Sequence, residues 1–375
     1  MDDSDARSCL QTAEGQIYLA ACSHAPVTKG LRRAMEGYMS DLLEFGNPWD
    51  LWMDRVAEAK SLFARLIGAK QDSVFPSFSV SSALASVLSS LDYGGRRGLV
   101  VSDMEYPTTN YLMLAQERFG AEVRTIKSRN HLLSPDDYCA AVDGSTKLTS
   151  AVHVSSLTGL RQDIGRICSI AHENGSLFYT DAYQSMGTIP LDVRSLDVDF
   201  LSSGNLKFLL GLPGTAFMYV RDGLVQELEP ASIGWFSQRD PFRFGPEKLE
   251  YSPTADRFQS GTLSIPSLYA AVEGMKTIIA AGQEEIWRRI SMLTSRAMDV
   301  ASGVGLPSLT PERAEQRGAI VSFRVRRPHD LENALRSEGI ITSSRGEGIR
   351  IAPHFYNTVD DIERAVTRIS ELRDA

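Results

Sequence analysis

The sequence predicts an α/β fold, in which a doubly wound, mainly parallel sheet precedes a smaller C-terminal α+β unit. Two observations support this prediction. Short apolar runs alternate with helical patterns between about residues 70 and 220, as in consecutive βαβ units. Most of these runs are also apolar or β-branched on both faces, which is typical of strands that helices cover on each side.

The alternating region supplies the expected elements of the sheet. We expect strands at residues 98–102, 122–126, 148–154, 176–180, 199–202 and 216–220. Helical patterns lie between them at residues 82–91, 109–119, 135–142 and 164–174. Because parallel strands need a crossover of this length, a helix after most strands favours a parallel arrangement.

The pattern changes after about residue 225, where prolines interrupt a loop-rich connector. A long helical pattern follows over residues 265–300. The last part predicts strands at 319–325, 340–342 and 349–351 and helices at 330–338 and 358–372. We therefore divide the chain into an N-terminal segment (1–16), a large domain (17–250), a connector with the long helix (251–300) and a small C-terminal domain (301–375).

Composition narrows the class of protein. The 375 residues are 43% hydrophobic and 23% charged, which is ordinary for a globular chain of about two domains. A net charge of -8 disfavours a dedicated nucleic-acid binder. The acidic N-terminus lacks the basic and apolar pattern of a signal peptide, and no apolar run is long enough to span a membrane. We expect a cytoplasmic protein that binds neither nucleic acid nor membrane.

Several common catalytic and metal-binding motifs are absent from the sequence. The four cysteines are widely spaced without a CxxC, which indicates neither a disulfide framework nor a zinc site, and no metal is expected. The sequence also lacks GxGxxG after the first strand, GxxxxGK[ST], HExxH and GxSxG. These absences disfavour a dinucleotide oxidoreductase and a nucleoside triphosphatase.

The block between residues 176 and 220 holds the most informative polar residues. One predicted strand runs into Asp181, with Gln184 three residues later, and the next strand ends in a Ser/Gly/Asn-rich turn that carries Lys207. Ligands of open α/β sheets bind at the carboxyl ends of the strands. The pattern therefore places a carboxylate and an amine at one candidate site.

Pyridoxal phosphate (PLP) requires this set of groups. The cofactor needs an amine for its aldehyde, a carboxylate for its pyridine nitrogen, and hydroxyl and N–H groups for its phosphate. Ser79, Val80 and Ser81 precede a predicted helix and suit the phosphate. In a simpler interpretation Asp181 and the serines are helix caps and Lys207 is a solvated loop lysine, and spacing alone leaves both interpretations open.

Four segments resemble the class V aminotransferase superfamily of PLP-dependent fold-type-I enzymes. They are, in the order of the family, DAYQSMGTIPLDV, LKFLLGLPGTAFMYV, RFQSGT and GIRIAPHFYNT. The resemblance covers nearly the whole chain and points to the branch that holds cysteine desulfurases, kynureninases and isopenicillin N epimerases. It implies PLP as the cofactor, an α-amino acid as the substrate, and a homodimer with active sites at the interface.

The resemblance also implies roles for individual residues. Lys207 would form the internal aldimine with PLP, Asp181 would pair with the pyridine nitrogen, and Gln184 would approach the phenolic oxygen. Arg350 would hold the substrate α-carboxylate. The cofactor phosphate would be bound by Ser79, Val80, Ser81, Ser203 and Asn205. Tyr106 would stack on the cofactor ring, and Ser156 would lie beside the phenolic oxygen. Across the dimer interface, Gly261 and Thr262 would contact the cofactor of the partner.

Departures from the family pattern bear on the reaction. Desulfurases carry a cysteine shortly before the C-terminal arginine, but this chain has none after Cys168, which disfavours persulfide formation. Leu206 stands where many relatives have a histidine before the lysine, and Ser156 replaces a frequent asparagine. The run AACSH suggests that His24 shapes a different pocket.

Three residues have two interpretations each. His153 is either a packed core histidine or an acid/base. Trp235 is either a pocket wall or ordinary packing. Arg345 is either a second anion contact for an acidic substrate side chain or a solvated loop arginine.

The family mechanism leaves the outcome of the reaction open. Lys207 would take the α-proton as general base, giving a quinonoid that is common to elimination, racemisation and transamination. We expect a lyase- or epimerase-type reaction. The alternatives are an aminotransferase that exchanges an amino group with a keto acid and a non-catalytic PLP-binding protein.

Overall fold

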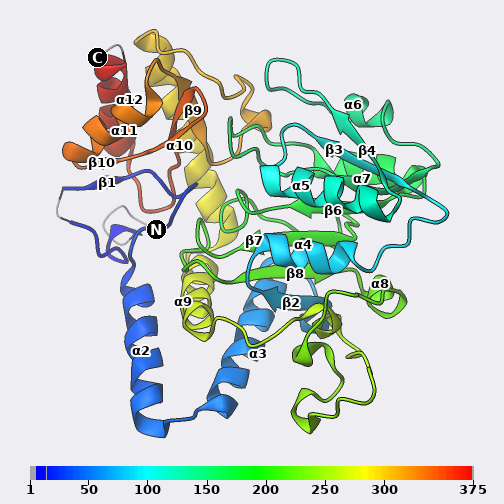
Figure 1. Ribbon diagram of the computed structural model, residues 1–375. Coiled ribbons are helices and arrows are strands. Elements are labelled where there is room, and N and C mark those ends of the chain that lie inside the picture. The colour runs from blue at the N-terminus through cyan, green and yellow to red at the C-terminus, as the bar shows by residue number, and fades with distance from the viewer. Residues whose placement is uncertain (1–5, 14, 374–375) are drawn as a thin grey trace.

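A seven-stranded sheet forms the centre of the chain in the computed structural model, which describes residues 6–13 and 15–373 (Figure 1). The strand order is β2-β8-β7-β6-β5-β3-β4, and β8 is the strand that runs antiparallel to its neighbours. The strands are β2 (Val74–Ser77), β3 (Gly98–Ser102), β4 (Glu122–Ile126), β5 (Thr146–Ser150), β6 (Leu177–Asp181), β7 (Phe200–Gly204) and β8 (Ala216–Val220). The predicted mainly parallel α/β sheet is confirmed.

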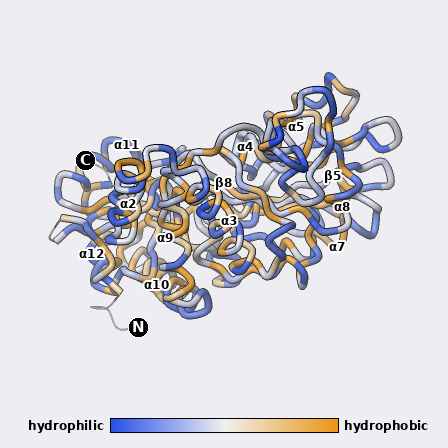
Figure 2. The backbone as a smooth tube through the Cα atoms, turned by 90° about the horizontal axis from the view of Figure 1, so that it is seen from below, coloured by the Kyte–Doolittle hydropathy of each residue, from blue (hydrophilic) through white to orange (hydrophobic). Residues whose placement is uncertain are grey.

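The sheet separates two apolar cores, because successive residues of each strand point to opposite faces. Val100, Phe178 and Phe217 belong to one core, whereas their neighbours Leu99 and Tyr179 belong to the other. The first core also contains residues of α3 (Trp49–Leu66), α7 (Ile164–Glu173) and α9 (Ile265–Ala281), and the second contains residues of α4 (Val80–Leu88) and α5 (Pro107–Ala115). Helices therefore cover both faces, which confirms the doubly wound arrangement (Figures 1 and 2).

Sequence analysis did not predict strand β2. Its four residues include Pro76, which cannot donate a backbone hydrogen bond to a neighbouring strand. The structure tolerates the proline because β2 lies at the edge of the sheet and pairs with β8 alone. The elements α2 (Lys29–Phe45), α6 (Pro135–Cys139) and α8 (Asp222–Glu227) complete this part of the chain.

The predicted long helix over residues 265–300 is two helices. Helix α9 ends at Ala281, and α10 (Gln283–Gly303) begins after Gly282. Gly282 has φ +80°, a left-handed conformation that other residues adopt only with strain, so it interrupts the helix. The prediction of one uninterrupted helix is therefore wrong at this position.

The C-terminal part is built around a three-stranded antiparallel sheet in the order β11 (Ser343–Arg345), β12 (Gly348–Ile351) and β9 (Val321–Arg324). Helices α11 (Pro328–Ser337), α12 (Val359–Leu372) and α10 supply its apolar core. Strand β1 (Ile17–Tyr18) pairs in parallel with β10 (Ile340–Ile341), so residues near the N-terminus join this part. The domain boundaries drawn from the sequence stay a proposal.

None of the helices in the described part of the chain is long and apolar enough to cross a membrane.

Helix α9 packs closely against the turn that carries Lys207. A methyl group on Gly274, in the middle of α9, would overlap the backbone carbonyl of Leu209. Only glycine therefore allows the helix to approach the turn this closely.

We predict that Gly274→Ala lowers the free energy of unfolding by roughly 1–3 kcal/mol, because the helix or the turn must move to admit the methyl group. Gly37→Ala is the matched control, since Gly37 lies in helix α2 with no atom within 4 Å of an added Cβ. That control should be neutral or stabilising. Equal effects of the two substitutions in denaturant titrations would contradict the close-packing argument.

Candidate active site

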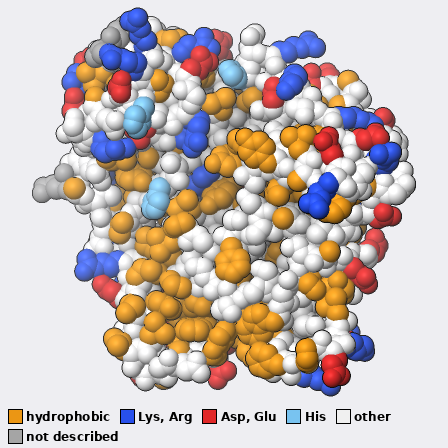
Figure 3. Space-filling view, in the orientation of Figure 1, with side chains coloured by type: hydrophobic (Ala, Val, Ile, Leu, Met, Phe, Trp, Pro, Cys, Tyr) orange, Lys and Arg blue, Asp and Glu red, His pale blue; other side chains and the backbone are white. Residues whose placement is uncertain are grey.

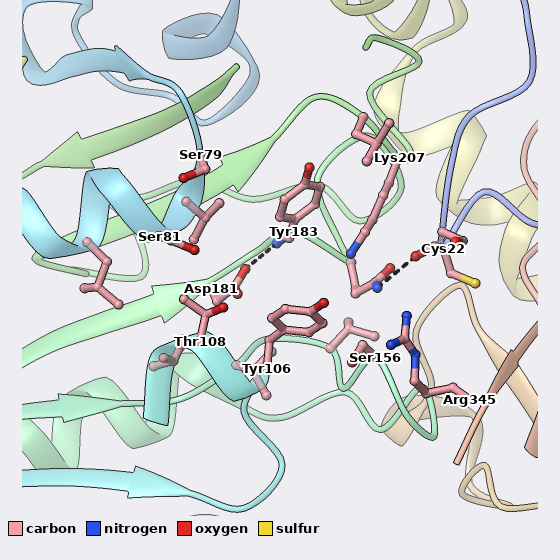
Figure 4. Close-up of a pocket in the computed structure, with 18 residues that line it drawn as sticks. Cys22, Ser79, Ser81, Tyr106, Thr108, Ser156, Asp181, Tyr183, Lys207 and Arg345 are labelled. Carbon is pink, nitrogen blue, oxygen red and sulfur yellow. Dashed lines mark hydrogen bonds between the residues drawn. The ribbon is translucent and has the colours of Figure 1, made fainter. Parts of the chain in front are cut away.

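A pocket of about 240 Å³ opens at the carboxyl ends of the central strands (Figure 4). The residues that follow strands β2, β3, β5 and β7 contribute to its wall, together with Asp181 at the end of β6. Strand β11 of the C-terminal sheet closes the opposite side with Arg345. The lining residues are Cys22, Ser23, Ser79, Val80, Ser81, Leu84, Tyr106, Thr108, Thr109, Val152, Val154, Ser156, Asp181, Tyr183, Gln184, Leu206, Lys207 and Arg345.

Asp181 provides a buried carboxylate at the floor of the pocket. It is the last residue of β6, is 4% exposed, and accepts a hydrogen bond of 2.8 Å from the Tyr183 N–H. Burial raises the pKa of Asp181, while the Tyr183 N–H and the charge of Lys207 act in the opposite direction. The Asp181 carboxylate therefore accepts a hydrogen bond within its own turn and also lines the pocket.

Lys207 extends into the pocket from the turn after β7. Its Nζ lies 4.1 Å from the centre of the Tyr183 ring and 5.7 Å from that of Tyr106. Enclosure by protein lowers the pKa of Lys207 to about 8, opposed by Asp181 and assisted by the positive charges of Arg350 and Arg345. More of the amine is therefore neutral near pH 7 than for a solvated lysine, as a nucleophile or base requires.

The N-terminus of helix α4 faces another part of the pocket. Ser79 caps the helix, because its Oγ accepts from the Ser82 N–H at 3.1 Å and the Ser82 Oγ accepts from the Ser79 N–H at 3.0 Å. The N-cap interpretation of Ser79 is therefore correct. The N–H groups of Val80 and Ser81 belong to the first turn, which has no intrahelical acceptors, and such groups favour an anion.

Gln184 leaves a buried polar atom unsatisfied. Its side-chain amide donates to the Cys22 carbonyl at 3.0 Å, but its Oε1 has no partner in the part of the chain that the structure describes. A ligand with polar groups would satisfy such an atom. Together with Lys207, Asp181 and the α4 N-terminus, Gln184 gives the donor set that PLP requires, so the residues fit this cofactor.

Several predicted contacts do not line the pocket. The Ser203 Oγ is buried and donates to the Gly204 carbonyl at 3.1 Å. The Asn205 amide, in its favoured orientation, donates to the carbonyls of Leu212 and Thr215. These two side chains therefore position the turn that carries Lys207, and the structure does not bring them to a ligand.

Other predicted residues lie farther from the pocket. His24 is exposed, and its Nδ1 contacts the Ala25 carbonyl. Trp235 packs among Trp49, Phe236, Phe242 and Phe244, in agreement with the packing interpretation. Gly261 and Thr262 lie outside the pocket of their own chain, and Thr262 is exposed.

The remaining predicted residues stand beside or behind the pocket wall. Arg350 is completely buried and donates to the Ser156 carbonyl at 2.5 Å, which places it directly behind Ser156. His153 is buried, and its Nδ1 contacts the Ser185 Oγ at 2.9 Å. Burial, followed by the charge of Arg161, lowers the pKa of His153 to about 3, so His153 is a neutral core histidine.

Sequence analysis missed Tyr183, Thr108, Cys22 and Glu105. Tyr183 lies within a segment already singled out, and Thr108 lies two residues after Tyr106, but nothing in the sequence shows which of these residues face inward. Glu105 stands behind the pocket: its Oε1 accepts from the Val152 N–H at 2.8 Å, and its buried Oε2 has no described partner. Burial, and then the charge of Asp181, raises the pKa of Glu105 from 4.5 to about 8.

We predict that Glu105→Gln changes how stability depends on pH. The raised pKa means that the folded chain keeps a proton which the unfolded chain loses above pH 4.5, so wild-type stability falls between pH 4.5 and about 8. Glutamine removes this loss. The free energy of unfolding of the variant should therefore rise relative to that of the wild type by up to about 1.4 kcal/mol per pH unit in this window. Denaturant titrations of the cofactor-free chain at several pH values would measure the effect. A difference in free energy between the variant and the wild type that does not change with pH would contradict it. Glu117→Gln, at an exposed position, is the control.

Comparisons with known proteins agree with this geometry. Residues 49–372 match the family model of Aminotransferase class-V. An uncharacterized aminotransferase of Bacillus subtilis, YcbU, is 34% identical to this chain. The match covers 97% of this chain and 96% of YcbU. The isopenicillin N epimerase of Streptomyces clavuligerus is 26% identical, covering 99% of this chain and 98% of the epimerase.

A solved structure supports the fold independently. The apo cysteine desulfurase of Thermococcus onnurineus superposes with a TM-score of 0.88 at 22% identity, covering 99% of this chain and 98% of the other. The fold-type-I architecture expected from the sequence is therefore confirmed. The chain belongs to the class-V aminotransferase family, whose cofactor is pyridoxal phosphate.

Proposed function

We propose that this protein uses pyridoxal phosphate to catalyse a lyase- or epimerase-type reaction on an α-amino acid. The observation that carries the proposal is the pairing of Lys207 and Asp181 in one enclosed pocket. An amine with a lowered pKa and a buried carboxylate are the two groups on which chemistry with this cofactor depends. When bound, the cofactor supplies a ring that withdraws electrons from the substrate α-carbon.

The roles of the protein groups follow from their positions. Lys207 would hold the cofactor, and its free amine would accept the substrate α-proton at Nζ. Asp181 would favour a proton on the pyridine nitrogen through its negative charge, and the N–H groups of Val80 and Ser81 would bind the phosphate. Tyr106 and Tyr183 flank Lys207 and limit the access of water to its amine.

The proton-transfer groups in the pocket favour elimination. No histidine lines the pocket among the residues described, and enclosure keeps the Tyr183 phenol protonated by raising its pKa. Among the described residues that line the pocket, Lys207 is therefore the group best suited to act as a base near neutral pH. Elimination requires a single base for the α-proton, whereas a two-base epimerisation requires a second base on the opposite face of the substrate.

The thiols in the chain do not suit persulfide chemistry. Cys22 lines the pocket, and its backbone carbonyl accepts a hydrogen bond from the Gln184 amide. Figure 4 shows its sulfur pointing away from Lys207. The segment of residues 340–350, where desulfurases carry their cysteine, contains no thiol. We therefore propose a reaction other than persulfide formation.

Transamination is the alternative that a specific comparison favours. The relative with 34% identity is named an aminotransferase, although an uncharacterized one. A non-catalytic PLP-binding protein is the third candidate, and the retention of both Lys207 and Asp181 in the pocket argues against it.

The predicted cytoplasmic location stays a prediction.

Visible absorption of the cofactor-loaded protein distinguishes these reactions. The protein is titrated with a panel of amino acids, including cysteine, while ammonia, pyruvate and other keto acids are measured. We expect a persisting absorption band of Lys207-bound cofactor, with ammonia and a cleaved side chain as products.

Other results would change the assignment. Bleaching of the band with keto acid formation would indicate transamination, and sulfane sulfur from cysteine would contradict the exclusion of persulfide chemistry. Lys207→Ala should lower turnover at least about 10²-fold, while the exposed control Lys127→Ala should leave it unchanged. Near-normal turnover of Lys207→Ala would overturn the proposal.

We propose a homodimer, on two grounds. Gly261 and Thr262 lie outside the pocket of their own chain, as residues that reach the phosphate site of a partner must. Apolar side chains are also exposed along helix α2, where Leu43 is 83% and Phe45 is 54% exposed. Figure 3 shows apolar side chains gathered on the lower part of the face that it views. Light scattering should give twice the mass of the chain. A monomer that holds a full complement of cofactor would contradict the proposal.

A further inference from the structure

Two arginines approach the pocket from the same face of one β-hairpin. In the register of β11 and β12, Ser343 lies opposite Arg350, and Arg345 lies opposite Gly348. Opposed residues of antiparallel strands point to the same face, as do alternate residues of one strand. Arg345 and Arg350 therefore project from diagonal positions on one face, a spacing of about 7–8 Å between backbones.

Arg350 is a buried cation that pairs with no carboxylate among the residues that the structure describes. Its Nη1 donates to the Ser156 carbonyl, its Nη2 donates to the Ser343 Oγ at 2.6 Å, and its Nε donates to the Ser343 carbonyl at 3.4 Å. All of these acceptors are neutral, and none of the recorded ion pairs in the described chain includes Arg350. Because burying an unpaired charge is costly, Arg350 favours an anion nearby.

Arg345 is a second cation that protein groups leave unengaged. It is exposed, lines the pocket, and makes no recorded hydrogen bond or ion pair with any described residue. The nearby Glu347 pairs with Arg324 instead. Figure 4 shows the Arg345 guanidinium directed into the pocket beside Ser156.

The cofactor phosphate does not account for these two charges. The phosphate candidates Ser79 and Ser81 lie at the opposite end of the pocket from Arg345 in Figure 4. Asp181 is the only carboxylate among the residues that line the pocket, and it stands between these ends. The hairpin end therefore holds two guanidinium groups, that of Arg345 in the pocket and that of Arg350 directly behind Ser156, whereas a simple α-amino acid has one carboxylate.

We infer that the substrate is an α-amino acid with a second acidic group on its side chain, which Arg345 binds while Arg350 binds the α-carboxylate. Arginine suits this role, because its fork of N–H donors matches a carboxylate or sulfinate. The inference rests on the proposed function and adds the class of substrate to it.

Binding of paired ligands to the cofactor-loaded protein tests this inference without requiring turnover. Changes in the visible spectrum give apparent dissociation constants for aspartate and glutamate and for their neutral isosteres asparagine and glutamine. We expect the wild type to bind at least one of the acids about tenfold or more tightly than its amide. Arg345→Gln should abolish this preference and change amide binding less than about twofold. Arg345→Lys should restore part of it.

Controls separate the possible failures. Arg326→Gln removes an exposed arginine outside the pocket and should leave the acid preference intact. A cofactor band and an unchanged melting temperature show that Arg345→Gln is folded and loaded. Wild type that binds acids and amides equally, or an Arg345→Gln variant that loses both equally, would overturn the inference. Absence of the cofactor band from wild type would instead contradict the proposed function.

Discussion

Enclosure of the Lys207 amine at the carboxyl edge of the sheet is the constraint on which the rest of the site depends. The turn that carries Lys207 is held from below by helix α9, which approaches it at Gly274, and from within by the amide of Asn205. Parallel pairing of β6 with β7 sets Asp181 beside the start of the same turn. The α/β fold therefore brings an amine and a carboxylate together, and the loops around them exclude enough water to alter both pKa values.

The electrostatic arrangement divides the pocket into distinct regions. Asp181 lies at the floor of the pocket, and Glu105 stands behind the pocket. The N-terminus of α4 favours an anion at one end, while Arg345 lines the other end with Arg350 behind Ser156. Such separation positions a cofactor and a substrate by charge before any reaction takes place. A binding role also explains why the protein leaves buried polar atoms such as Gln184 Oε1 without a partner, because an unsatisfied buried atom lowers the stability of the fold.

Local sequence was sufficient to predict most of the fold and part of the site. The bounds predicted for β3, β4 and β8 agree with the structure. Strands β3 and β8 are buried on both faces, whereas β4 is a partly exposed edge strand. Asp181, Lys207 and the α4 N-terminus were found because each directly follows or begins an element. The proline-containing β2 and the pairing of β1 with β10 depend on long-range contacts that no local pattern records. The break at Gly282 is a local backbone conformation that glycine permits but that the helical pattern does not reveal. For the same reason the sequence did not show the burial of Glu105 or the exclusion of Ser203 from the pocket.

The central claim is that Lys207 carries the cofactor. Reduction of the PLP-loaded protein with borohydride makes the linkage between lysine and cofactor permanent, and mass spectrometry of the digested chain then locates it. The account predicts that the cofactor mass is attached to the peptide that contains Lys207 and to no other peptide. Attachment at a different lysine, or no attachment to a protein that shows the cofactor band, would contradict it.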